Sequence, residues 1–202
     1  TVLDLPAVDV VVHEIVGDLA TEEGLAACLA DLQRRPAVVN AAPGWSLPCC
    51  VETWCAPVRL HVAEDPETPG VRRLPFVVPE QARLGELKMF EKVDANVPVE
   101  LQQCRTMTWT IKEGATLTGL ACLPRIQLDE EEVLDTWTCG PTNWRTVFVR
   151  LDPVPVETDD EVSVVVNCDL TRFPVVHTFT VSRLRGQKSC SVGTVVVSLS
   201  EC

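Results

Sequence analysis

The sequence predicts a mainly β protein, in which a short strand–helix unit precedes a sandwich-like or barrel-like β domain. Two observations carry this prediction. Residues 1–47 contain one apolar run and then apolar residues at helical spacing, whereas residues 48–202 contain short runs rich in Val, Thr and Leu, about ten residues apart. The chain has 202 residues, 46% of them hydrophobic, which is enough for a packed core.

The strand–helix unit is predicted from its apolar pattern and its charged ends. A strand is expected over residues 8–13 and a helix over about 22–34. Thr21 is a plausible N-cap, and Glu22 and Glu23 would lie in the first helical turn, where carboxylates complement the helix dipole.

The β domain is predicted from short runs of β-branched and aromatic residues that turn residues separate. These runs cover residues 51–62, 105–111, 116–128, 144–151, 161–170, 175–184 and 194–200. Residues 63–92 are mixed in character and are interpreted as a loop with a short helical insertion.

Composition narrows the function classes. The formal net charge of −12 argues against general binding to nucleic-acid backbones, which requires clustered Lys and Arg. No apolar run approaches the ~18 residues of a membrane-spanning helix, so we expect no membrane partner. The ten cysteines show no CxxC or Cys/His pattern typical of zinc sites. We therefore expect no metal and reduced, mostly buried thiols, which favours a cytoplasmic or nuclear location.

The loop after the first strand concentrates carboxylates. Glu14 ends the apolar run, Gly17 follows, and Glu22 and Glu23 come just before the helical pattern. Ligand sites in α/β folds lie beyond the carboxyl ends of strands. Carboxylates facing each other there could bind a metal, act as an acid/base pair, or bind a guanidinium in a bidentate manner. They could equally be ordinary solvated acids.

Three segments resemble one known family. The spacing of Glu14, Gly17 and Glu23 is similar to the double-glutamate loop of the protein arginine N-methyltransferases. SLPCCVETWCAPV (46–58) resembles the family's crossover from its methyltransferase domain to a β-barrel. GPTNWRTVFVRLDPVPV (140–156) resembles the family's Thr-His-Trp loop and the strand that follows it.

The resemblance implies a site and a reaction. Glu14 and Glu23 would be the catalytic residues that bind the substrate guanidinium, and Thr142, Asn143 and Trp144 would line the substrate pocket. Asn143 stands where the family usually has histidine. The implied reaction transfers a methyl group from S-adenosyl-L-methionine to arginine in protein substrates.

The resemblance also implies a domain organisation. Residues 1–47 would be the last part of the methyltransferase domain, and residues 48–202 a β-barrel domain for substrate binding and dimerisation. S-adenosyl-L-methionine would be bound mainly by a preceding part that this chain lacks, so we assign no cofactor-binding residues and expect the chain to be inactive alone. A homodimer or heterodimer is expected. The alternatives are an inactive methyltransferase-like regulatory partner subunit and a β-barrel protein-interaction domain.

Overall fold

A computed structural model of the chain describes residues 6–40, 42–62, 70–140, 142–186 and 188–199. Its elements, in chain order, are β1 (Val11–Val12), α1 (Leu25–Gln33), β2 (Ser46–Leu47), β3 (Cys50–Val58), β4 (Val71–Leu74), the 3₁₀ turn η1 (Glu80–Ala82), β5 (Lys88–Asp94), β6 (Gln102–Thr110), β7 (Ala115–Gln127), β8 (Val133–Asp135), β9 (Thr146–Val156), β10 (Glu161–Asp169), β11 (Val176–Arg185) and β12 (Lys188–Ser198).

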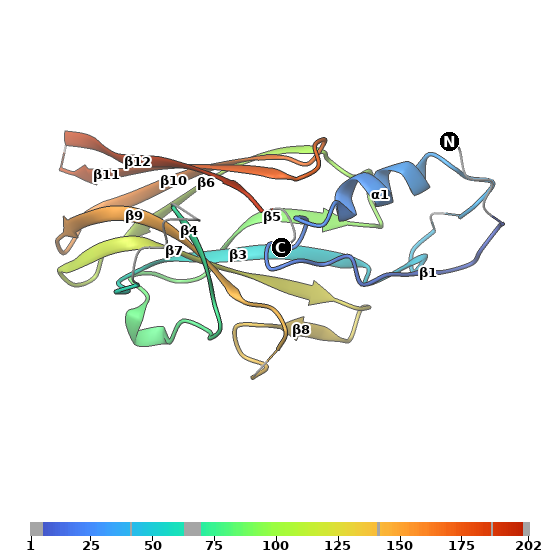
Figure 1. Cartoon of the computed structure of the whole chain (residues 1–202), viewed down its shortest axis with the longest axis horizontal. Coiled ribbons are helices and arrows are strands. Elements are labelled where there is room, and N and C mark those ends of the chain that lie inside the picture. Colours follow the sequence, from blue (N-terminus) through green and yellow to red (C-terminus); the bar gives the residue numbers. More distant parts are fainter. Residues whose placement is uncertain (1–5, 41, 63–69, 141, 187, 200–202) are drawn as a thin grey trace.

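Two large sheets form the body of the molecule. One has the strand order β4-β9-β7-β3-β5, with β8 paired to β7, and the other has the order β12-β11-β10-β6. Figure 1 shows these sheets as two layers that face each other, with β1 and α1 at one end of the elongated molecule. The predicted mainly β, barrel-like fold is therefore confirmed, although the sheets are open at their edges.

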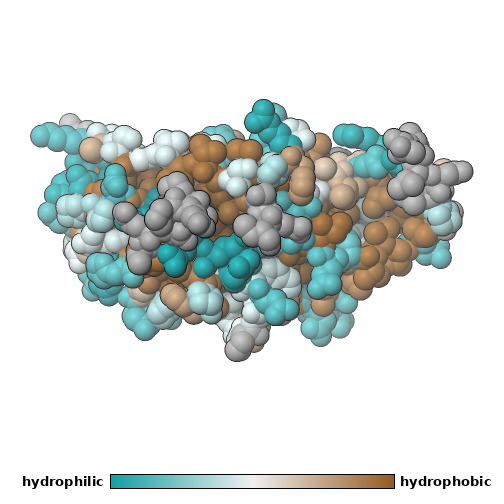
Figure 2. Space-filling model, viewed as in Figure 1, coloured by the Kyte–Doolittle hydropathy of each residue, from teal (hydrophilic) through white to brown (hydrophobic). Residues whose placement is uncertain are grey.

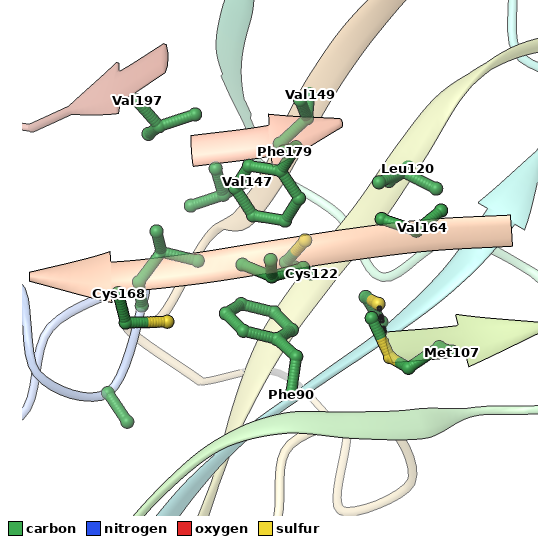
Figure 3. Packing of buried hydrophobic residues seen from close by; sticks show 14 of the residues in the cluster. Phe90, Met107, Leu120, Cys122, Val147, Val149, Val164, Cys168, Phe179 and Val197 are labelled. Carbon is green, nitrogen blue, oxygen red and sulfur yellow. Dashed lines mark hydrogen bonds between the residues drawn. The ribbon is translucent and has the colours of Figure 1, made fainter. Parts of the chain in front are cut away.

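One hydrophobic core runs through both parts of the chain. Its main cluster joins Leu25 of α1 and Trp45 to Phe90 of β5 and Phe179 of β11. The Phe90 and Phe179 rings meet edge to face, with centroids 5.3 Å apart. Figure 3 labels both among the buried residues. Since α1 buries its apolar face in this core, packing fixes the loop before α1 against the sheets. The domain boundary between residues 47 and 48 stays a prediction.

Three elements differ from the sequence prediction. The strand expected over 8–13 is regular only at Val11–Val12, where β1 pairs in parallel with β2. The helix begins at Leu25, after Gly24 in a left-handed conformation with φ of 85°, and not at residue 22. Residues 80–82 form the one helical turn in the described part of 63–92, which otherwise contains β4 and β5.

The first strand region leaves apolar surface uncovered. Val8, Val10 and Val12 are 39%, 50% and 73% exposed, and Leu47 of the paired strand is 36% exposed. Figure 2 shows hydrophobic surface at the same end of the molecule. Parallel strands are usually covered on both faces, whereas one face of this two-stranded sheet is exposed.

The cysteines divide between core and surface. The nine in the described part of the chain are free; Cys50, Cys55, Cys122 and Cys168 are buried, whereas four others are exposed. The expectation of mostly buried thiols thus holds for only part of the set, because several cysteines lie on outward-facing strand positions or in turns. Within the described ranges, no helix is long and apolar enough to cross a membrane.

Candidate functional site

The loop between β1 and α1 is held by one of its own carboxylates. The Glu22 side chain folds back so that Oε1 accepts the Asp18 amide at 3.1 Å and Oε2 accepts the Leu19 amide at 3.2 Å. Gly17 permits this, since a Cβ there would lie 2.1 Å from Glu22 Cγ. Glu22 is therefore a buried part of the loop's framework and not a residue of the first helical turn.

Two arginines of the β domain bind the underside of the same loop. Arg73 of β4 places Nε 2.9 Å from Asp18 Oδ2 and Nη2 2.9 Å from Glu22 Oε1. Arg145 donates its backbone amide to Asp18 Oδ1 at 2.6 Å and places Nε 3.2 Å from Asp18 Oδ2. Asp18 and Glu22 are thereby neutralised by the chain's own guanidinium groups.

Burial and charge act in opposite directions on Glu22. Removal from water raises the pKa of its carboxyl above the ordinary value of 4.5, while Arg73 and the two loop amides lower it. Burial dominates, so the pKa is raised overall. The Glu22 carboxyl therefore binds a proton more readily in the folded protein than in water.

A second loop, between β8 and β9, closes over the first. Trp144 donates its indole Nε1 to the carbonyl oxygen of Val16 at 2.7 Å. With the Arg145 contacts to Asp18, this bond joins segments that are more than 120 positions apart in the chain. The two loops together line an open cavity of about 730 Å³, a size typical of ligand sites.

All five residues predicted to form the site line this cavity: Glu14, Glu23, Thr142, Asn143 and Trp144. Glu14 and Asn143 are exposed, whereas the other three are half-buried. The structure thus brings them together, while their catalytic or binding roles stay predictions. Asp18, Arg73 and Arg145 also line the cavity, and sequence reasoning missed them.

Chemically, the cavity suits a cation with several N–H donors. Four carboxylates line it: Asp18 and Glu22 bind Arg73, and Glu14 and Glu23 lie along the same cavity. A guanidinium can donate to two carboxylates at once, and the indole of Trp144 adds a flat apolar surface. Glu22 fills the space beside Gly17, so no side chain could be accommodated at position 17 without displacing Glu22.

Comparison with solved structures identifies the fold, whereas comparisons of sequence find no match. No protein family profile and no curated protein sequence matches this chain. Among solved structures, protein arginine methyltransferase 10 of Arabidopsis thaliana, described as having a uniquely open conformation, is similar with a TM-score of 0.75 and 12% identity, over 97% of this chain and 71% of that chain.

A second solved structure is similar to the same extent. The Trypanosoma brucei PRMT1 enzyme–prozyme heterotetrameric complex with AdoHcy matches with a TM-score of 0.70 and 14% identity, over 96% of this chain and 71% of that chain. At these identities the likeness concerns the fold, which is that of the protein arginine methyltransferases.

Proposed function

We propose that this chain is the C-terminal portion of a protein arginine N-methyltransferase, which transfers a methyl group from S-adenosyl-L-methionine to arginine in protein substrates. The observation that carries the proposal is the convergence of two distant loops on one cavity. The loop bearing Glu14 and Glu23 is hydrogen-bonded, through Val16, to the loop bearing Trp144. The shared fold with arginine methyltransferases supports the same assignment.

The proposed role of the two glutamates is to bind and orient the substrate guanidinium. Arginine is a poor nucleophile because its lone pairs are delocalised and its charge is fixed. Carboxylates of Glu14 and Glu23 would hold positive charge on some nitrogens and leave one terminal nitrogen richer in electrons. Positioning of that nitrogen supplies much of the rate enhancement, since effective molarities reach on the order of 10⁵ M or more.

The proton released on methylation needs an acceptor, and one of the two glutamates can take it. Thr142 and Trp144 would line the arginine side chain. Asn143 can donate and accept hydrogen bonds but cannot carry a proton at neutral pH, so we expect no proton relay through this position. S-adenosyl-L-methionine supplies the methyl group, and residues outside those described here would hold it.

A second candidate function is a regulatory partner that binds an active methyltransferase without catalysing the reaction itself. The observation that favours it is that Asp18 and Glu22, two of the four carboxylates that line the cavity, are paired with the chain's own Arg73. One of the similar structures is an enzyme–prozyme complex, which makes a heteromeric arrangement reasonable for this fold. The partners would be arginine-containing protein substrates for the first candidate and the active methyltransferase for the second.

Transfer of a labelled methyl group to an arginine–glycine peptide separates the two candidates. The full-length protein should label this peptide and should not label a matched peptide in which lysine replaces every arginine. Labelling that appears only after an active methyltransferase is added would favour the regulatory partner. Equal labelling of both peptides would contradict both proposals.

A further inference from the structure

A buried carboxylate lies next to the loop between β1 and α1 (residues 13–24, called the glutamate loop below), outside the cavity described above. Glu91 of β5 is fully buried, as are Thr21 of the loop and Thr53 of β3. His177 of β11, 1% exposed, places Nε2 2.8 Å from Glu91 Oε1. An isolated charge in a protein core is costly, so a Glu at this position calls for a specific reason.

The strand geometry explains how Glu91 reaches the interior. The pairing of β3 with β5 shifts register between Thr53 and Trp54, which are opposite Glu91 and Met89. Phe90 is therefore the extra residue of a β-bulge. A bulge breaks the alternation of side chains, and here both Phe90 and Glu91 are buried. Figure 3 shows Phe90 within the core.

The hydrogen bonds around Glu91 form a consistent set of donors and acceptors. Thr21 donates its hydroxyl to Oε1, and Thr53 donates its hydroxyl to Oε2 at 2.6 Å. The Thr53 oxygen in turn accepts the backbone amide of Ala20 at 3.0 Å. Two consecutive loop residues, Ala20 and Thr21, are thus both connected to one carboxylate.

The ionised form of Glu91 suits this arrangement. Burial would raise the pKa of Glu91, but the charge of His177 and the hydrogen bonds from His177, Thr21 and Thr53 outweigh it and hold the pKa below its ordinary value. An ionised carboxylate only accepts, which matches three donors converging on two oxygens.

These contacts lie beside the proposed catalytic residues in the chain. Thr21 precedes Glu23 by two residues, and a turn follows in which the Gly24 amide donates to the Thr21 carbonyl oxygen at 2.9 Å. We propose that Glu91, supported by His177, is a positioning group that fixes the glutamate loop through Thr21 and Thr53, and so sets where Glu23 lies for methyl transfer. The catalytic part of this inference rests on the proposed function.

Cys168 lies close enough to Glu91 and His177 for the three side chains to form a metal site. Its thiol, a Glu91 oxygen and a His177 ring nitrogen all lie within 4.8 Å of one another, which is close enough for a metal ion. The two Glu91 oxygens are already satisfied by three protein donors, so the hydrogen-bonded arrangement accounts for the cluster without a metal.

The test compares single methyl-for-hydroxyl replacements. Thr21→Val and Thr53→Val each remove one hydroxyl of the network and keep the side-chain shape. Thr118→Val is the matched control, because the buried Thr118 hydroxyl also accepts a backbone amide, that of Leu60 at 2.7 Å. Thr118 lies on β7, far from the glutamate loop in the sequence. Thr21→Ser restores the hydroxyl that Thr21→Val lacks.

The readout is amide hydrogen exchange over residues 14–24 by mass spectrometry. We expect exchange there to become at least about tenfold faster in Thr21→Val and Thr53→Val, and to stay near wild type in Thr118→Val and Thr21→Ser. Unchanged exchange in both network variants, or an equal rise in Thr118→Val, would overturn the proposal. Zinc bound to purified wild-type protein at one equivalent would also overturn it in favour of a metal site.

Methylation kinetics of the full-length protein then test the catalytic part. We expect kcat to fall about tenfold in Thr21→Val while KM for the methyl donor stays unchanged, because the loop and not the donor site is altered. Unchanged kcat despite faster exchange would overturn the positioning role. If the wild-type protein transfers no methyl group, the proposed function fails, while the exchange measurement still decides whether Glu91 anchors the loop.

Discussion

The carboxylates of the glutamate loop divide between two environments. Asp18 and Glu22 are buried, and Arg73 binds both. Glu14 and Glu23 line the same cavity but are less buried, Glu14 being exposed and Glu23 half-buried. The difference teaches that acids of one short segment can be either framework or functional groups, and that contacts from distant strands decide which. Four predictions test this division, from the largest expected effect to the smallest.

Loss of the negative charge of Glu14 or of Glu23 should abolish most catalysis. Glu14→Gln and Glu23→Gln each keep the side-chain size but cannot hold charge on a bound guanidinium. The loss of one charged partner in a site shielded by substrate costs roughly 3–5 kcal/mol, or two to four orders of magnitude in kcat/KM. Steady-state methylation of an arginine-containing peptide by the full-length protein measures this.

Glu130→Gln serves as the control, since Glu130 is an exposed acid of another turn. We expect its activity to match wild type. If Glu14→Gln and Glu23→Gln are both as active as wild type, these residues do not bind the substrate guanidinium, and the regulatory-partner candidate gains support.

Truncation of the Glu22 side chain should mainly affect the stability of the fold. Glu22→Ala leaves the Asp18 and Leu19 amides without their acceptor and opens space beside Gly17, so we expect a loss of about 2–4 kcal/mol in the free energy of unfolding. Glu22→Gln keeps one acceptor but removes the charge that binds Arg73, so its cost should be smaller than that of Glu22→Ala, about 1–2 kcal/mol. Urea denaturation of both variants measures the difference; equal losses would argue that the charge itself is needed.

Acidification should act oppositely on two buried acids. The pKa of Glu91 is lowered in the folded state, so its stabilising contribution is complete above its ordinary pKa of 4.5 and is lost as pH falls through the lower folded value. The pKa of Glu22 is raised, so its protonation adds stability as pH falls through that raised value.

Urea denaturation between about pH 3 and pH 7 tests these signs. The stability advantage of wild type over Glu91→Gln should shrink on acidification, whereas the stability of wild type relative to Glu22→Gln should improve. A difference that stays constant with pH for both variants would mean that neither carboxyl changes its pKa on folding.

The smallest expected effect concerns Asn143. Because Asn143 is exposed, Asn143→His should change the free energy of unfolding by less than about 0.5 kcal/mol. A histidine there would titrate near ~6.5 and should add a limb to the pH dependence of kcat, with a change in rate below about tenfold. Asn167→His, on an exposed position of β10, is the control; the same new limb in both would exclude a local effect at the cavity.

Sequence reasoning located β3, β6, β7 and β9 to β12, because each carries a short run of β-branched residues between turns, but it missed β4, β5 and β8. Glu14, Glu23 and Trp144, which line one cavity, were named through the resemblance of two segments to the protein arginine N-methyltransferases. Sequence reasoning placed the helix start three residues early, because Thr21 and Glu22 have the composition of a helix N-terminus. Their side chains instead bind Glu91 and the loop's own amides.

The contacts that sequence reasoning missed are pairings between distant elements. Arg73 lies in a segment that was interpreted as a loop with a helical insertion, and its partners are more than 50 positions away. Glu91 has an ordinary strand context, and only the bulge at Phe90 turns it inward. Neither spacing nor propensity contains this information, since both depend on which strands become neighbours.

The bond between Trp144 and Val16 spans 128 positions, and this separation has a consequence for the timing of synthesis. A ribosome adds about 5–20 residues per second, so the glutamate loop is synthesised on the order of ten seconds before the loop that bears Trp144. Contacts of such long range also form late during folding. A chain released before Trp144 would therefore carry its acidic loop without a pocket, and any arginine-binding capacity would be acquired only near the end of translation.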